Sequence, residues 1–167
     1  MRFKSFLKSL INANLLFYVF LLPVVGDVVG TVLGQSESYW SSHYQKINEA
    51  APVYPLLQIH PGVFIIGTLL IWLPITYFLT KKLPRPFNLW AAMALFAGHA
   101  YNSVNWLRVT QKNHHILSGS GHASLSLSLI PPFLYVLLIG FIAAKVLDKY
   151  FHVYSNEVFH RDELAKS

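Results

Sequence analysis

Cysteine is absent from this chain of 167 residues, and charged side chains make up only 12% of it. Without cysteine the protein can form no disulfide, no thiolate nucleophile and no thiolate metal site. The charged fraction is about half of the roughly 25% that is usual in soluble domains. Hydrophobic residues account for 54% of the chain. These figures exclude a separate soluble domain and indicate a membrane protein.

Four apolar stretches are long enough to cross a hydrocarbon core, which requires roughly 20 residues per helix. They cover residues 11–33, 61–80, 87–107 and 124–144. Apolar and aromatic residues continue at helical spacing over 145–158 and predict a short juxtamembrane surface helix. The first stretch continues past Asp27 without a small-residue cleavage pattern, so we expect an uncleaved signal anchor. The sequence therefore predicts an all-α, polytopic membrane protein with four transmembrane helices in one domain, residues 1–167.

The basic residues are distributed unevenly around these stretches. Ten of the thirteen Lys and Arg residues lie before the first stretch, between the second and third, or after the fourth. Short basic loops stay in the cytoplasm, so both termini are expected to be cytoplasmic, in a bacterial or archaeal cytoplasmic membrane. The net charge of +6 is thus a topology signal and a contact for anionic lipid. No nucleic-acid partner is expected.

Polar side chains within and between the stretches gather in the opposite, outer half of the membrane. A charge at the bilayer centre costs about 2.5–3.5 kcal/mol on insertion scales, so such a residue needs a partner, a cavity or a function. The candidate polar pocket consists of Asp27, Glu49, His60, His99, Asn102 and Asn105.

Two interpretations of this pocket are open. In the first, Asp27 or Glu49 accepts a hydrogen bond from His99 or Asn102, and these bonds hold the bundle together. In the second, Glu49, His60 and His99 bind a divalent metal, because imidazole and carboxylate groups suit zinc, copper or iron. The sequence lacks an H-E-x-x-H pair that would favour a metal. Haem is disfavoured, since it needs two histidines that face each other at one depth.

Two catalytic patterns are incomplete. Residues 118–122 read S-G-S-G-H and resemble a motif of lipid phosphatases that use a histidine nucleophile, and residues 81–86 resemble the basic motif of that family. One span separates the two segments, which places them on opposite faces, and the third motif is missing. Residues 99–102, H-A-Y-N, invite comparison with rhomboid-type serine proteases, whose six core helices four spans cannot supply.

A D-x-x-x-T pattern at 27–31, followed by N-E-A-A-P at 48–52, resembles an uncharacterised family of small membrane domains. That family has D-x-x-x-T and then N-E-x-N-P, and Ala51 stands in place of its second Asn. The resemblance implies that Asp27 and Glu49 belong to one structural unit, and it carries no activity. The residues that match are Asp27, Thr31, Asn48, Glu49 and Pro52.

These observations predict a small integral membrane protein that is a non-catalytic subunit or scaffold of a larger membrane assembly. Its partners are then the lipid bilayer and another membrane protein or further copies of itself. One alternative is an outward-facing metal-binding protein or metal-dependent hydrolase, with the divalent metal as its cofactor. A second is an oligomeric transporter or channel component, which the inner half of the spans does not favour. The polar residues there lie near the rim: Asn12, Asn14, Thr76 and Asn88.

Overall fold

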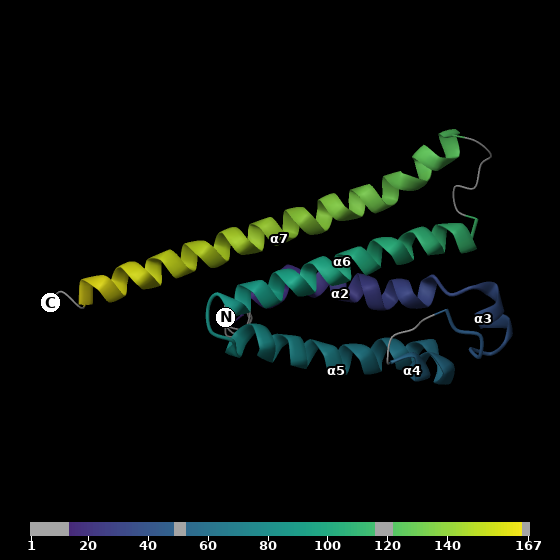
Figure 1. Ribbon diagram of the computed structural model, residues 1–167, viewed down its shortest axis with the longest axis horizontal. Helices are drawn as coiled ribbons and strands as arrows, with labels where there is room; N and C mark the ends of the chain where they lie inside the picture. Colours follow the sequence, from purple (N-terminus) through teal and green to yellow (C-terminus); the bar gives the residue numbers. More distant parts are fainter. Residues whose placement is uncertain (1–13, 49–52, 116–121, 165–167) are drawn as a thin grey trace, which may run out of the picture.

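The computed structural model describes residues 14–48, 53–115 and 122–164, with side chains described except at 122–127 and 155–164. Over these residues the chain is helical and contains no strand. The helices are α2 (Leu15–Leu33), α3 (Glu37–Ser41), α4 (Tyr54–Ile59), α5 (Pro61–Lys82), α6 (Phe87–Asn113) and α7 (His122–Leu164). Figure 1 shows the four long helices side by side, with α3 and α4 at one end. We call this the loop end, and the opposite end, where α5 turns into α6, the turn end.

Three segments are long and apolar enough to cross a membrane: Leu15–Leu33, Pro61–Lys82 and Ser128–Tyr154. They correspond to the first, second and fourth predicted spans, so the all-helical class and three apolar helices of spanning length are confirmed. The third predicted span lies in α6, which has 27 residues but a lower mean hydropathy. The reason is its loop-end half, which carries His99, Asn102, Ser103 and Asn105.

The boundaries of the last two long helices differ from the prediction. α6 continues beyond residue 107 to Asn113, and α7 is one helix from His122 to Leu164. The predicted surface helix at 145–158 is therefore a direct continuation of the last span. Two of its aromatic rings are covered by a cation, since the guanidinium of Arg85 lies 5.0 Å from the ring centre of Tyr150 and 3.6 Å from that of Tyr154. Cation–π contacts of this kind stabilise the packing of the α5–α6 turn on α7.

α2 is the central helix of the bundle and contacts α5, α6 and α7. Half of its apolar span is buried, against 11% for α5 and 17% for α7. Its side chains Leu16, Phe20 and Val24 pack with Ala92 of α6 and Ala143 of α7 in the main core. The outer faces of α5 and α7 remain apolar and exposed, which fits contact with lipid tails; they include Ile66, Leu70, Phe78, Phe133, Leu137 and Phe141.

Glycines on α2 allow α6 and α7 to approach it closely. Gly26, Gly30 and Gly34 are spaced by four residues and so share one face of the helix. A methyl group added at Gly26 would lie 2.5 Å from the hydroxyl oxygen of Tyr135, and one added at Gly30 would lie 3.0 Å from Cβ of Trp106. A methyl group at Gly34 would overlap the indole ring of Trp106. Small residues at helix interfaces have this role in membrane bundles.

At the loop end, the connection between α2 and α5 is packed into a second apolar cluster. Tyr39 of α3 and Leu57 of α4 are fully buried and contact Val28, Val32 and Phe64. The hydroxyl of Tyr39 donates a hydrogen bond to the carbonyl oxygen of Leu57 at 2.9 Å. The long connection thus forms a cap on the bundle in the part of it that is described.

Candidate functional site

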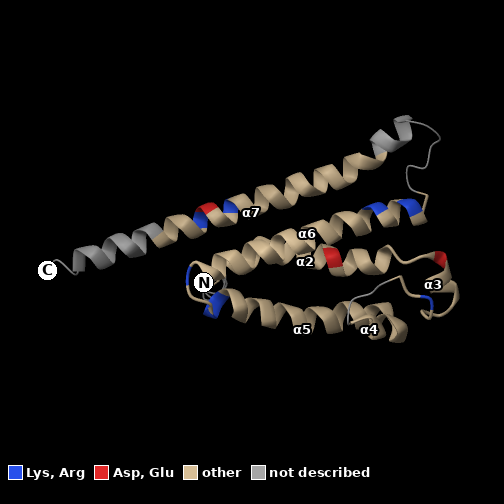
Figure 2. Ribbon diagram, viewed as in Figure 1, with Lys and Arg blue, Asp and Glu red and all other residues tan. Residues whose placement is uncertain are grey.

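Asp27 is the only charged residue of α2, and it lies within the apolar band of the bundle. The charged residues of α5 and α6 lie toward the helix ends, whereas Lys145, Asp148 and Lys149 lie near the middle of the longer α7, as Figure 2 shows by colour. Pro23 and Thr31 lie one turn before and one turn after Asp27, and Thr31 Oγ1 donates to the Asp27 carbonyl oxygen at 2.8 Å. The carboxylate is therefore left to interact with the neighbouring helices.

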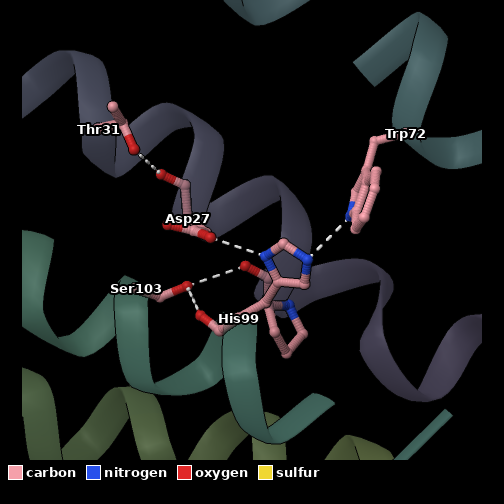
Figure 3. Close-up of polar contacts among 6 residues, drawn as sticks. Asp27, Thr31, Trp72, His99 and Ser103 are labelled. Atoms are coloured by element: carbon pink, nitrogen blue, oxygen red, sulfur yellow. Dashed lines mark hydrogen bonds and ion pairs between the residues drawn. The ribbon is translucent and has the colours of Figure 1, made fainter. Parts of the chain in front are cut away.

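The carboxylate of Asp27 is paired with the imidazole of His99 on α6. Asp27 Oδ2 lies 2.7 Å from His99 Nδ1, and the two side chains are 13% and 18% exposed. On the other edge of the ring, Trp72 Nε1 of α5 donates to His99 Nε2 at 2.9 Å. Figure 3 shows the imidazole between the carboxylate and the indole. The chain of hydrogen bonds Asp27–His99–Trp72 thus joins three helices within the apolar band.

The Trp72 contact fixes which nitrogen of His99 carries the proton. An indole N–H can only donate a hydrogen bond, so His99 Nε2 must offer its lone pair. The neutral imidazole then carries its hydrogen on Nδ1 and donates it to Asp27 Oδ2. An ionised Asp27 therefore accepts this hydrogen bond, and no cation that the described residues contain lies next to it.

Ser103 binds backbone rather than the imidazole. Its Oγ lies 2.9 Å from the carbonyl oxygen of Pro23 and 2.6 Å from that of His99, and donates to them. The first of these bonds links α6 to α2 beside the proline. A nucleophilic serine would instead have its hydroxyl against the free nitrogen of the histidine, and Trp72 occupies that position.

Tyr135 of α7 brings a further hydroxyl to this region. Its oxygen is buried and lies against Gly26, close to the Ser103 hydroxyl. Sequence reasoning passed over this residue because α7 reads as a plain apolar span. The same is true of Trp72, which reads as one more apolar residue of α5.

Asn102 and His99 line an open groove along α6. The groove has a volume of about 350 Å³, and the rest of its lining is apolar, with Ala94 and Gly98 among the small residues. The side chain of Asn102 is exposed, and neither Asn102 nor Asn105 makes a side-chain hydrogen bond to the described part of the chain. The two predicted pocket residues on α6 thus differ in their contacts: His99 is half-buried and bonded to α2 and α5, whereas Asn102 is exposed.

The remaining pocket residues lie elsewhere. His60 is exposed at the start of α5, where its Nδ1 accepts from the backbone N–H of Gly62 at 3.0 Å and its ring contacts Tyr44. Glu49 and Pro52 fall outside the described residues. Asn48 is described, and its backbone N–H donates to the buried side chain of Gln35 at 2.9 Å.

The described residues contain no group of three His, Asp or Glu side chains that could hold a metal ion. The chemistry of His99 agrees with this, because one of its ring nitrogens carries a hydrogen toward Asp27 and the other accepts from Trp72. Neither nitrogen has a free lone pair for a ligand bond. The geometry suits hydrogen bonding between helices.

No protein-family model matches the chain, and neither a curated protein nor a solved structure is similar enough to match it. The resemblance to a family of small membrane domains stays an expectation. The site itself has to support any functional conclusion.

Proposed function

We propose that this protein is a four-span integral membrane protein that serves as a non-catalytic subunit of a membrane assembly. We further propose that the groove around Asn102 on α6 binds a second copy of the chain. The observation that carries this proposal is an exposed amide, without a hydrogen-bond partner, on the outside of a helix that lies among membrane spans.

The packing of α6 supports a fourth span. The turn between α5 and α6 covers only residues 83–86, so α6 runs back along α5 and α2. A helix of 27 residues is about 40 Å long at 1.5 Å per residue, enough for a hydrocarbon core of about 30 Å. The polar residue that would be costly there, His99, has partners on both neighbouring helices. With the basic turn in the cytoplasm, the loop end faces outward and both termini face inward.

A non-catalytic role is supported by how the polar groups are used. An Asp–His pair is the base of many hydrolytic sites, but its reactive nitrogen must face a nucleophile or substrate. Here that nitrogen accepts from Trp72, and Ser103 is bound to backbone. A metal-dependent hydrolase has less support for the same reason, and a transporter has less because Asn14 and Thr80, near the turn end, are bonded to each other.

A second copy is the occupant that the chemistry of Asn102 favours. An amide side chain both donates and accepts, so two of them can pair reciprocally. Two copies inserted with the same orientation associate about an axis along the membrane normal, which brings Asn102 of both copies to the same depth. Ala94 and Gly98 lie two turns and one turn away on the same face, and a methyl group added at Gly98 would touch nothing. A partner helix can therefore approach the backbone of α6 closely.

Cysteine crosslinking in a bilayer tests this proposal, because the chain has no cysteine of its own. A single cysteine at Ala94, on the Asn102 face, is expected to form a disulfide-linked dimer under mild oxidation. A cysteine at Leu137, exposed on α7, is the matched control and is expected to stay monomeric. Asn102→Val in the Ala94→Cys background should weaken association about 3-fold to 20-fold, the equivalent of roughly 0.6–1.7 kcal/mol. Equal crosslinking at both positions, or a monomer in every variant, contradicts the proposal.

A further inference from the structure

We infer that Asp27 and His99 form a proton-binding site, and that protonation of His99 releases α5 from α6 by breaking the Trp72 hydrogen bond. The ligand is a proton, and the element that responds is α5. This inference concerns contacts within one chain, so it stands apart from the proposed pairing of two copies.

The hydrogen bonds to Asp27 and Trp72 fit an imidazole that carries one proton, and they do not fit an imidazole that carries two. In the present arrangement Nδ1–H donates to Asp27, and Nε2 accepts from Trp72 Nε1 at 2.9 Å. A proton that adds to the Nε2 lone pair creates an N–H that points at the indole N–H. Two donors cannot share a hydrogen bond, so the imidazolium form requires Trp72 to move away. The proton comes from hydronium in water, whose O–H bond breaks as the N–H bond forms.

Protonation changes the net charge of the pair. With a neutral imidazole and an ionised carboxylate, the pair carries one negative charge in a largely apolar band. A proton on His99 converts it into an ion pair with no net charge. The carboxylate of Asp27 is already placed at 2.7 Å to bind the imidazolium.

The groups that face the pair come from each helix packed around it. α2 contributes Asp27 itself, α5 contributes Trp72, and α6 contributes the hydroxyl of Ser103, which is bound to backbone. From α7, the hydroxyl of Tyr135 lies against Gly26, which is next to Asp27 in the sequence. No Lys or Arg that the structure describes is among them, so the charge of the pair is set by protons alone.

The proton has a route to the imidazole, and its arrival has a consequence for packing. His99 lines the open groove on α6 together with Asn102, and its side chain is 18% exposed. Among the residues with described side chains, the Trp72–His99 bond is the only hydrogen bond between α5 and α6 side chains. α5 is otherwise tied to α2 near the turn end, where Asn14 donates to Tyr77 O and Thr80 Oγ1. Leu69 and Leu73 also pack against the main core, so loss of the Trp72 bond removes the hydrogen bond between α5 and α6 and leaves the middle of α5 held by apolar packing alone.

Trp72 itself reports on this switch. The full chain carries four tryptophans, and replacing Trp40, Trp90 and Trp106 by Phe leaves Trp72 as the only one. In lipid nanodiscs, the emission of Trp72 is expected to change in one sigmoidal step between about pH 8.5 and about pH 4.5, the range in which histidine titrates. His99→Gln keeps an acceptor for the indole but cannot bind the proton, and it should abolish the step. Asp27→Asn keeps the acceptor for Nδ1–H and removes the negative charge, and it should move the midpoint of the step to lower pH.

A second measurement uses the wild-type chain, so it does not depend on whether the variant with Trp72 as its only tryptophan folds. The wild-type chain labelled with 5-fluorotryptophan gives four fluorine resonances, and Trp72→Phe identifies that of residue 72. That resonance is expected to shift with pH in the wild type and to stay fixed in His99→Gln. A Trp72 signal that is constant over the whole range, or a step that persists in His99→Gln, overturns the inference. A midpoint unchanged in Asp27→Asn removes Asp27 from the site.

Discussion

Asp27 and His99 lie 72 residues apart in the sequence, and a distance of 2.7 Å joins the carboxylate oxygen of one to the ring nitrogen of the other. The pair holds α2 against α6, and Trp72 extends it to α5. Since each group in this chain is a donor or an acceptor for the next, removing one leaves its neighbour unpaired. The cost of a substitution thus depends on whether the new side chain can still accept or donate.

Two substitutions of Asp27 separate the hydrogen bond from the charge. Asp27→Asn still offers an oxygen to His99 Nδ1–H and carries no charge into the membrane, so the free energy of unfolding is expected to stay within about 1 kcal/mol of the wild-type value or to rise. Asp27→Ala leaves the N–H unpaired and should lower it by about 1–3 kcal/mol. Denaturant titration in mild detergent measures both. If Asp27→Asn lowers the free energy of unfolding as much as Asp27→Ala does, the ionised carboxylate itself is needed for stability.

The glycines of the bundle provide a second matched pair. Gly26→Ala places a methyl group 2.5 Å from the Tyr135 hydroxyl oxygen, so α7 has to shift and stability should fall by about 1–3 kcal/mol. Gly140→Ala, on α7, meets nothing within 4 Å and should be neutral or favourable by up to about 1 kcal/mol, the helix-propensity difference. Thermal unfolding monitored by circular dichroism compares the two. Equal midpoints would show that α2 and α7 are not packed closely at Gly26.

Part of this site could be predicted from the sequence, because ionisable residues in an apolar stretch are costly enough to require an explanation. That argument selects Asp27, His60 and His99, of which the structure brings Asp27 and His99 together and leaves His60 exposed at the start of α5. It does not select Trp72, because tryptophan in a membrane span is ordinary and its single N–H leaves no pattern in the sequence. A buried histidine whose Nδ1–H binds a carboxylate needs a hydrogen-bond donor for its Nε2, so the sequence indicates that some donor is present. Only three-dimensional packing shows that this donor is Trp72.

The same reasoning explains what the hydropathy pattern missed. Gly26, Gly30 and Gly34 are small enough to be counted with the apolar residues, yet their spacing of four residues is the signature of a close helix interface. The outer polar residues of α6 were grouped into one pocket because depth in the membrane is all that a linear sequence gives. Contacts between helices distinguish them, since His99 is bonded to Asp27 of α2 whereas the side chain of Asn102 is exposed.

Alkaline pH tests the cap at the loop end. Burial raises the pKa of the Tyr39 hydroxyl above its usual value, and the neighbouring Tyr44 raises it further. The unfolded chain loses this proton near pH 10, whereas the folded chain retains it to a higher pH. The stabilisation by the neutral phenol is thus fully present below about pH 10 and is lost as the pH rises through the raised folded-state value.

Tyr39→Phe isolates this contribution from the other tyrosines. At neutral pH it should cost about 1 kcal/mol, because the carbonyl oxygen of Leu57 loses its donor. Above about pH 10 the difference between wild type and variant should narrow, since only the wild type carries the ionisable group at this position. Unfolding curves at a series of pH values measure the difference. If the difference in free energy of unfolding between wild type and Tyr39→Phe stays constant up to high pH, Tyr39 is solvated in the folded protein.

Asn14 is the N-cap of α2, but its side chain does not cap the helix. It donates instead to Tyr77 O at 3.0 Å and to Thr80 Oγ1 at 2.9 Å, and so ties the start of α2 to the end of α5. Asn14→Ala should lower the free energy of unfolding by about 0.6–1.7 kcal/mol, as for other polar contacts in membrane bundles. Asn14→Asp should lower the free energy of unfolding at least as much, because a carboxylate cannot donate to either oxygen.

Asn88→Ala is the control for this prediction. The Oδ1 atom of Asn88 accepts only from the adjacent Leu89 N–H among the described residues, and its removal should change the free energy of unfolding by less than about 0.5 kcal/mol. A loss at Asn88 that equals the loss at Asn14 would show that the tie between α2 and α5 adds nothing beyond a local contact.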